Sequence, residues 1–370
     1  MRKTHVIFCA VMLMVLMVIT VSFASSSTPI TYSGPPITLR YSSHVSKTHM
    51  VWQNTMVPWL KLLEEMSEGK LIIKTFTDRV LHGPKDGFKA CVSNITDMTH
   101  CYPLWQPKSF NLNHCTSLPF AFPNAYVAAM VSEELYPKYF KEEYEKMGVY
   151  LAHYQTISPY HLISKKPIRT LEDMKGLKVR SGGGPIGEAV KRLGAVPVLL
   201  TTAEVYSAFQ RGLIDAVLLY DSGFVSFRLH EIGKYRTELS LGTAGIPYCL
   251  NRKTFDNLPD GLKRTFYNAQ RILAQMAGQG YENADVEARE IMKKKGIEFI
   301  TLEPEELERW KALVEPTWEA FIKENEALGL PARDLIRDLR ELTKKYSTWT
   351  PEQIMEHVTK NPVHGIIDGM

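Results

Sequence analysis

The stretch "MKGLKVRSGGGPIGEAVKRLGAVPVLL", residues 174–200, predicts the central unit of the fold. A short strand ends at Arg180, a glycine-rich loop follows at 182–184, and Pro185 suits the first turn of a helix. A second strand is predicted at 196–200. Strand, loop, helix and strand in this order are typical of an open α/β sheet, in which small ligands bind at the carboxyl ends of strands.

Arg180 stands at such a strand end, and its planar guanidinium fits a carboxylate through two parallel hydrogen bonds. Two other interpretations are open at this point. Arginines at strand ends also form surface ion pairs. In addition, Gly182, Gly184 and Gly187 spell the G-x-G-x-x-G of a dinucleotide site, with Glu204 near the position of a ribose-binding acid. Against the dinucleotide site, a proline interrupts the fingerprint and the pattern lies in the middle of the chain.

The composition is that of an ordinary globular protein. The chain has 370 residues, of which 45% are hydrophobic and 23% charged, so it is long enough for two hydrophobic cores. Its formal charge of +4 is small, and its lysines are dispersed without a basic run interleaved with aromatic residues. Nucleic acid is therefore not an expected partner.

The beginning of the chain predicts export. Two basic residues precede an apolar run at 6–21, and small residues follow in the pattern of a cleavage site. We expect a signal peptide at 1–24, cleaved after Ala24, and a flexible spacer at 25–36. An uncleaved membrane anchor is the alternative. No other segment is apolar enough to cross a membrane, so we expect the mature protein to lie in the periplasm and not to be embedded in the membrane.

Four cysteines remain beyond the predicted signal peptide. An oxidising compartment permits disulfides, but no spacing is diagnostic, and buried free thiols are the alternative. The four residues are Cys91, Cys101, Cys115 and Cys249.

Strands and helices alternate from residue 37 onward, which predicts mostly parallel sheets covered by helices, an α/β fold class. One very long helix is expected at 262–294, and it would run across two lobes. Several polar and aromatic residues follow predicted strands and are candidates for contact with a ligand, although packing is the alternative role of each aromatic. Beside Arg180, these candidates are His44, Tyr102, Trp105, Tyr160, His161, Tyr220, Asp221 and Tyr248.

The chain also resembles a known family over about 37–345. The similar segments, in order, are "GKLIIKTFTDRVLHG" at 69–83, "SNITDM" at 93–98, "SLPFAF" at 117–122, "KKPIRTLEDMKGLKVR" at 165–180 and "LGAVPVLLTTAEVYSAFQRGLIDA" at 193–216. They resemble the motifs of the extracytoplasmic solute-binding proteins of tripartite ATP-independent periplasmic (TRAP) transporters, the DctP-type family.

The resemblance implies a two-lobed, type II periplasmic binding fold that closes on a small organic acid and passes it to the TRAP membrane permease. It implies that Arg180 holds the ligand carboxylate, and a monomer is the expected state. The expected division is lobe I at 37–157 and 246–285, lobe II at 158–245 and 286–346, and a loosely attached tail at 347–370. The sequence departs from the family pattern at Leu219, near a usual asparagine, and at 159–161, where a second arginine is often found.

These residues favour a monocarboxylate with an apolar or aromatic body, and a hydroxyl or amine on it would meet Asp221 or His161. No serine-hydrolase elbow, zinc motif or convincing carboxylate pair is present in the sequence, so an enzyme is not expected. No cofactor or metal is called for. The alternatives are a sensory or scavenging binding protein that serves a receptor, and a periplasmic enzyme that binds a nucleotide at 182–187.

Overall fold

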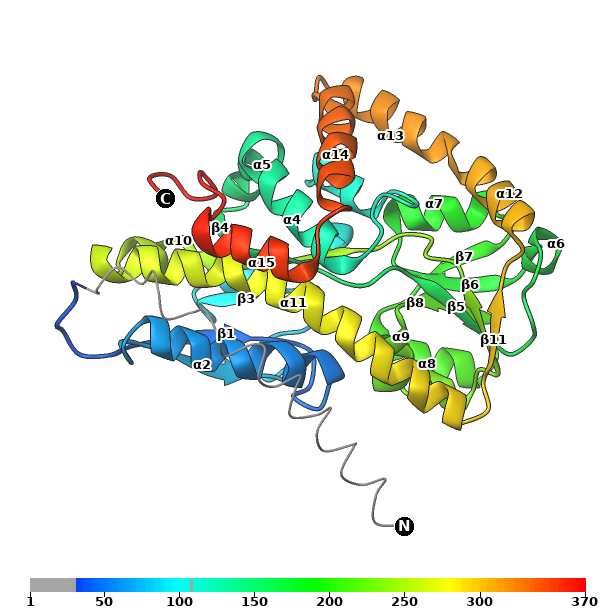
Figure 1. Cartoon of the computed structure of the whole chain (residues 1–370), viewed down its shortest axis with the longest axis horizontal. Helices are drawn as coiled ribbons and strands as arrows, with labels where there is room; N and C mark the ends of the chain where they lie inside the picture. Colours follow the sequence, from blue (N-terminus) through cyan, green and yellow to red (C-terminus); the bar gives the residue numbers. More distant parts are fainter. Residues whose placement is uncertain (1–30, 107–108) are drawn as a thin grey trace, which may run out of the picture.

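The computed structural model describes residues 31–106 and 109–370, and in this part the chain folds around two separate β-sheets (Figure 1). The first sheet has the order β2-β1-β3-β10-β4. Strands β1, β2 and β3 run parallel, and β10 lies antiparallel to both β3 and β4. The strands are β1 (Ile37–Ser42), β2 (Leu71–Phe76), β3 (Met98–His100), β4 (Val149–Thr156) and β10 (Gly245–Asn251). This sheet and its helices form lobe I.

The second sheet contains the strand that carries Arg180. Its order is β11-β9-β5-β8-β6-β7, with β6 parallel to β7 and β8, and with β5 antiparallel to β8 and β9. The strands are β5 (His161–Ser164), β6 (Lys178–Ser181), β7 (Val196–Leu199), β8 (Ala216–Leu219), β9 (Tyr235–Glu238) and β11 (Glu298–Thr301). This sheet and its helices form lobe II, and the α/β fold class with two lobes is confirmed.

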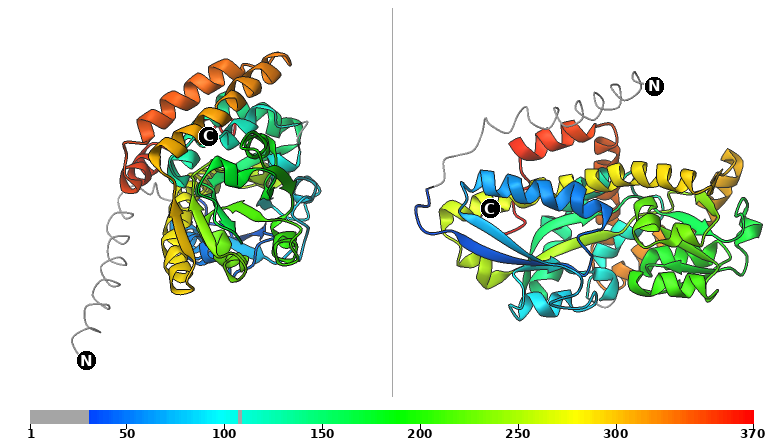
Figure 2. Two further views of the ribbon diagram at one scale, coloured as in Figure 1. Left: turned by 90° about the vertical axis from the view of Figure 1, so that its right-hand side faces the viewer. Right: turned by 90° about the horizontal axis from the view of Figure 1, so that it is seen from below.

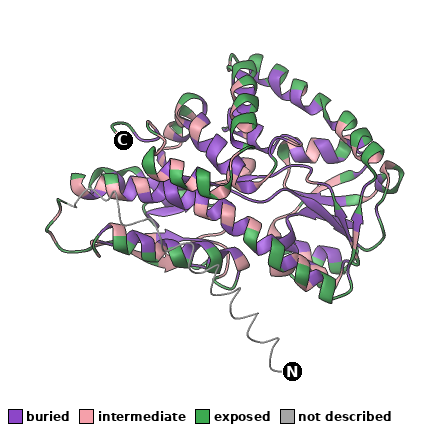
Figure 3. Ribbon diagram, in the orientation of Figure 1, coloured by how far each residue is buried: buried purple, intermediate pink, exposed green. Residues whose placement is uncertain are grey.

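Helices cover both sheets, and their apolar faces are buried against the strands (Figure 3). Those of lobe I are η2 (Trp52–Met56), α2 (Val57–Met66), α3 (Gly87–Val92), η3 (Pro103–Trp105), η4 (Leu112–Ser117), α4 (Ala125–Leu135), η5 (Tyr136–Phe140), α5 (Lys141–Lys146) and α10 (Arg252–Asp256). Those of lobe II are α6 (Leu171–Met174), α7 (Gly184–Arg192), α8 (Thr202–Gln210), α9 (Asp221–Ser226) and η6 (Leu229–Glu231).

The helix α11 (Asp260–Lys294) runs across both lobes, as predicted (Figures 1 and 2). It packs on α4 and β4 in lobe I and on α9 in lobe II. Gly278 and Gly280 do not interrupt it. A Cβ atom at Gly278 would lie 2.7 Å from the Cα of Tyr126, and one at Gly280 would lie 2.1 Å from the hydroxyl of Thr55. These glycines therefore allow the helix to approach lobe I closely.

The C-terminal helices differ from the expected division of the chain. They are α12 (Pro304–Val314), α13 (Pro316–Glu326), α14 (Ala332–Tyr346) and α15 (Pro351–Lys360). Helix α12 packs on α7 of lobe II, but α14 packs on α4 and α15 on α11, and their buried residues belong to the core of lobe I. The segment 347–370 is thus not a loose tail, because Ile354, Val358, Ile366 and Ile367 are at most 4% exposed.

The four cysteines beyond the predicted signal peptide are buried free thiols, the second of the two alternatives. Within 31–106 and 109–370, no helix combines the length and the apolar character that a membrane span requires. The predicted signal peptide and the first half of the predicted spacer, 25–30, lie outside the described residues.

Candidate functional site

Arg180 is a buried cation at the carboxyl end of β6. Its side chain donates from Nε to the carbonyl of Leu200 at 3.1 Å and from Nη1 to the carbonyl of Leu218 at 3.3 Å. The residue is 5% exposed, and burial lowers the pKa of its guanidinium, an effect opposed by Tyr160 and Tyr220. No carboxylate of the described residues lies within ion-pair distance of it. A buried charge without an opposite charge is costly, so this guanidinium is arranged for an anion from outside the chain.

The two other buried arginines already have carboxylate partners. Arg236 donates to both oxygens of Asp221 at 3.0 and 2.8 Å, and Arg271 lies 3.5 Å from a carboxylate oxygen of Glu133. Arg180 is therefore the one buried arginine in the described chain that has no acidic partner.

Tyrosines from both lobes and from α11 lie near one another, and two of them, Tyr160 and Tyr220, lie near Arg180. Tyr220 and Tyr281 pack edge to face with ring centroids 5.2 Å apart, and Gln155 donates to the hydroxyl of Tyr281 at 3.2 Å. Burial raises the pKa of Tyr160 to about 12, which keeps its hydroxyl protonated. Burial raises the pKa of Tyr102, and the nearby Tyr248, Tyr281 and Tyr160 raise it further. We call Tyr102, Tyr160, Tyr220, Tyr248 and Tyr281 the tyrosine cluster.

Histidines line the cleft on the side of lobe I. His44 lies with its Nδ1 3.4 Å from Nδ1 of His100, and its ring packs on Tyr102 at 5.6 Å between centroids. His49 reaches across to lobe II, where its Nε2 lies 3.4 Å from the hydroxyl of Tyr220. Burial lowers the pKa of both His44 and His49 to about 4, so these two rings are neutral near pH 7.

A cavity of about 220 Å³ opens at this side of the cleft, between the two lobes. From lobe I it is lined by His44, Val45, Ser46, Thr48, His49, Asp78, Arg79 and Pro84, and from lobe II by Thr202, Ala203, Ser226 and Phe227. Of the predicted ligand residues His44 alone lines this cavity, and Arg180, at a strand end of lobe II, is not among its lining residues.

Other candidates have their polar atoms or rings engaged within the protein. Asp221 is held by Arg236 and also accepts from Arg289 at 3.1 Å. His161 accepts at Nδ1 from the backbone N–H of Leu239 at 3.2 Å, and burial lowers its pKa to about 3. These contacts favour a role in the frame of lobe II over contact with a ligand.

The aromatic candidates of lobe I also have partners. Tyr248 stacks on Tyr41 and on His153, with centroids 5.3 and 4.6 Å apart. Trp105 is partly exposed, and the ammonium group of Lys85 lies 5.0 Å from the centre of its ring. These contacts place Tyr248 in the core of lobe I and Trp105 at the surface of that lobe beside Lys85.

Sequence reasoning missed Tyr281, Gln155 and His49. Tyr281 is in the middle of the long helix, where its spacing is that of a core residue, and it reaches the cluster because α11 crosses between the lobes. His49 precedes a helix and carries no motif. Its distance to Tyr220, which is far away in the sequence, and its place in the lining of the cavity between the lobes indicate a role in the cleft.

Glu204 has a local role that weakens the dinucleotide interpretation. Its carboxylate accepts from the backbone N–H of Thr201 at 2.9 Å and from the hydroxyl of the same residue at 2.6 Å, which completes a capping box at the start of α8. One oxygen of the carboxylate that a ribose would need is thus engaged in capping the helix.

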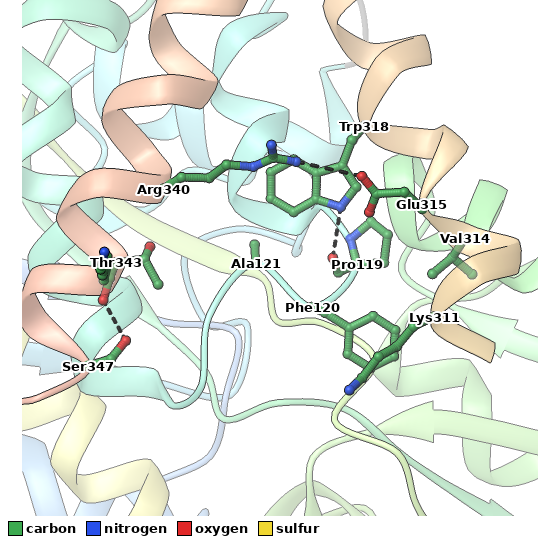
Figure 4. Close-up of a pocket in the computed structure, with 11 residues that line it drawn as sticks. Pro119, Phe120, Ala121, Lys311, Val314, Glu315, Trp318, Arg340, Thr343 and Ser347 are labelled. Carbon is green, nitrogen blue, oxygen red and sulfur yellow. Dashed lines mark hydrogen bonds and ion pairs between the residues drawn. The ribbon is translucent and has the colours of Figure 1, made fainter. Parts of the chain in front are cut away.

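A second hollow, of about 410 Å³, lies away from the predicted site (Figure 4). The rings of Phe120 and Trp318 line it, together with Lys311 and with Arg340, whose guanidinium stacks over the indole at 4.8 Å. The indole N–H donates to the carbonyl of Pro119 at 3.1 Å. None of the predicted ligand residues borders this hollow.

Comparison with known proteins gives a consistent family. Residues 42–325 match the sequence model of "Bacterial extracellular solute-binding protein, family 7", DctP. The chain is 22% identical over 284 residues to the C4-dicarboxylate-binding periplasmic protein DctP of Rhodobacter capsulatus, which is 76% of this chain and 85% of that protein. Its match to a solute-binding protein of Albidiferax ferrireducens is 27% identical and spans 49% of that relative's length.

Two solved structures share the fold. A TRAP solute-binding protein from Rhodoferax ferrireducens, in complex with copurified benzoate, has a TM-score of 0.80 at 22% identity, covering 84% of this chain and 98% of that one. A TRAP periplasmic solute-binding protein from Bordetella bronchiseptica, with bound (R)- and (S)-mandelate, has a TM-score of 0.77 at 25% identity, covering 84% and 99%.

Proposed function

Because the chain belongs to the bacterial extracellular solute-binding protein family 7, we propose that it captures a small organic acid between its two lobes and delivers it to the membrane subunits of a TRAP transporter. The single observation that carries this proposal is the state of Arg180, a buried arginine without an acidic partner in the described chain. A ligand carboxylate supplies the missing charge and accepts the guanidinium's free donors.

The ligand is a monocarboxylate with an aromatic or apolar body. One unpaired buried arginine matches one carboxylate, whereas a second carboxylate would need a second cation at the same depth. The tyrosine cluster offers ring faces for an aromatic body and hydroxyls that bond to its substituents. Benzoate and mandelate in the two structures named above are ligands of this chemistry, and their presence in those proteins supports the same class here.

We assign the ligand contacts to Arg180, Tyr102, Tyr160 and Tyr220, with His44 at the mouth of the cleft. Trp105 and Tyr248 border this set. Asp221 and His161 are assigned to the frame that holds it, because their polar atoms are already bonded within lobe II.

We further propose that the protein acts as a monomer outside the cytoplasm, is not an enzyme, and is exported with a signal peptide at 1–24. The family description, extracellular solute-binding protein, supports the compartment and the binding role. The likeness to TRAP solute-binding proteins supports delivery to a permease over delivery to a receptor.

A thermal-shift and calorimetric screen tests the proposal. The probes are benzoate, mandelate, succinate and NAD, and the proteins are the unmodified chain, Arg180→Ala, and Arg228→Ala as a control that removes an exposed arginine of the same lobe. We expect binding of an aromatic monocarboxylate, a loss of at least about 3 kcal/mol of binding in Arg180→Ala, and no change in Arg228→Ala. A response to NAD alone, or full binding by Arg180→Ala, would overturn the proposal.

A further inference from the structure

Leu104 belongs to lobe I by its place in the chain but packs with lobe II. It lies in the short turn η3, which follows β3 and Tyr102. Nevertheless its side chain packs against the hydrophobic cluster of lobe II, the cluster that contains Tyr160, Val179 and Ile186. Leu104 is therefore an apolar contact that crosses the cleft.

Leu104 packs against the glycine loop 182–184, which follows Arg180 and Ser181 in the chain. A Cβ atom built on Gly184 would lie 3.0 Å from Cδ2 of Leu104, and one on Gly182 would lie 3.7 Å from Cδ1 of the same side chain. The hydroxyl of Tyr160 is 4.0 Å from the Gly182 position. Because the glycines of the loop carry no side chains, Leu104 packs directly against the loop backbone, beside the proposed ligand contact Tyr160.

The opposite side of the loop is supported from within lobe II. A Cβ atom on Gly183 would lie 3.3 Å from Cδ1 of Leu199, the last residue of β7. Leu199 and Leu104 therefore flank the same loop, one from its own lobe and one from across the cleft. Leu199 is 55% exposed, so its truncation does not open a core.

We propose that Leu104 is a positioning residue that seals the closed cleft over Arg180 and sets the rate at which the ligand leaves. This inference rests on the proposed function and adds a residue to the same site. When Leu104 is seated, bulk water is kept from the loop beside the guanidinium, and the attraction between Arg180 and a carboxylate is stronger in the drier surroundings. The lobes must separate this contact before the ligand departs, so its loss speeds dissociation more than it slows association.

The test compares Leu104→Ala with Leu199→Ala. The second substitution truncates a leucine that contacts the same loop from within lobe II. Stopped-flow tryptophan fluorescence with benzoate and with mandelate gives the association and dissociation rates. We expect dissociation to rise about ten-fold in Leu104→Ala with association and the melting temperature of the free protein nearly unchanged, and both rates to stay within about two-fold in Leu199→Ala. Equal dissociation rates in the two variants would overturn the inference.

A second measurement needs no ligand. The double variant Leu104→Cys with Gly182→Cys places two thiols across the cleft, and mild oxidation by a small disulfide, which takes up their two electrons and two protons, should join them. The single variant Leu104→Cys is the control, since the native cysteines are buried. Failure to crosslink would overturn the contact itself. If the double variant crosslinks but the unmodified protein binds none of the acids, the proposed function is wrong and the contact of Leu104 across the cleft still holds.

Discussion

Arg236 holds both carboxylate oxygens of Asp221, at 3.0 and 2.8 Å, in a pair that is no more than 2% exposed. The pair joins β9 to the start of α9, the turn that also carries Tyr220. Two adjacent residues thus serve two purposes, because Tyr220 faces the cleft while Asp221 is fixed inside lobe II.

The first prediction concerns this pair. Asp221→Ala leaves the buried Arg236 with only the half-exposed Glu238, 3.8 Å from its Nη1, as an acidic neighbour, and should lower the free energy of unfolding by about 3 kcal/mol. Urea unfolding followed by circular dichroism measures it, and Asp260→Ala, whose side chain is 97% exposed, is the control. A variant with unchanged stability but without ligand binding would instead place Asp221 in the ligand site.

The second prediction is that Arg180 costs the free protein stability. Its guanidinium is buried without a carboxylate, so Arg180→Met, which keeps much of the side-chain volume, should leave the melting temperature of the ligand-free protein unchanged or raise it by a few degrees. The same variant should lose the shift that an aromatic acid produces. A clear fall in the ligand-free melting temperature would show that Arg180 mainly supports the fold.

The third prediction is a flat pH dependence of binding between pH 6 and 9. The pKa of His44 and of His49 is lowered to about 4, that of His161 to about 3, and that of Tyr160 is raised to about 12. None of these groups titrates in that range, and Arg180 stays charged throughout it. Asp285, whose pKa is raised to about 7 and which lies near Tyr220, does titrate there, so the measurement is made on Asp285→Asn. Calorimetry at each pH checks this, and a step in affinity near pH 6.5 would contradict the neutral histidines.

The fourth prediction concerns Asp285 on α11, which accepts from the backbone N–H of Ser222 at 2.7 Å. Burial raises its pKa to about 7, and the nearby Asp221 adds to the effect. Because the folded pKa lies above the unfolded value, the folded state binds the extra proton, and stability falls as the pH rises from about 4 to about 7.

Asp285→Asn keeps the acceptor for Ser222 and removes the ionisation. We therefore expect its free energy of unfolding to exceed that of the unmodified protein by an amount that grows from pH 5 to pH 8. Glu282 and Arg289, the other charged groups near this carboxyl, are the same in both proteins. A constant difference across that range would mean that Asp285 is ionised throughout.

The sequence predicts Arg180 at the end of a strand that a glycine-rich turn follows, and the structure has it there; its contact with a ligand carboxylate stays a prediction. Tyr102 and Tyr220 were also predicted to follow strands, and the structure has them after β3 of the first sheet and β8 of the second; their contact with a ligand stays a prediction. The pairing of Asp221 with Arg236 could not be predicted from the sequence. Arg236 lies fifteen residues further on, and its proximity depends on how β9 returns beside β5.

Residues supplied by helices escaped prediction in the same way. Tyr281 has the spacing of any buried helical residue, and only the crossing of α11 between the lobes brings it to Tyr220. The packing of the C-terminal helix on lobe I was not predicted, because α15 buries two main apolar positions, Ile354 and Val358, which is too few for a clear periodic signal. Its partner surface on α11 is remote in the sequence.

The fifth prediction follows from that helix. Ile354 is 1% exposed and packs in the core of lobe I, so Ile354→Ala should lower the free energy of unfolding by about 2–5 kcal/mol. Glu356→Ala, on the exposed face of the same helix, pairs only with Lys360 and should change it by less than about 0.5 kcal/mol. If urea unfolding gave the two variants equal stability, the buried Ile354 would contribute nothing to the core. The segment 347–370 would then be a loosely attached tail.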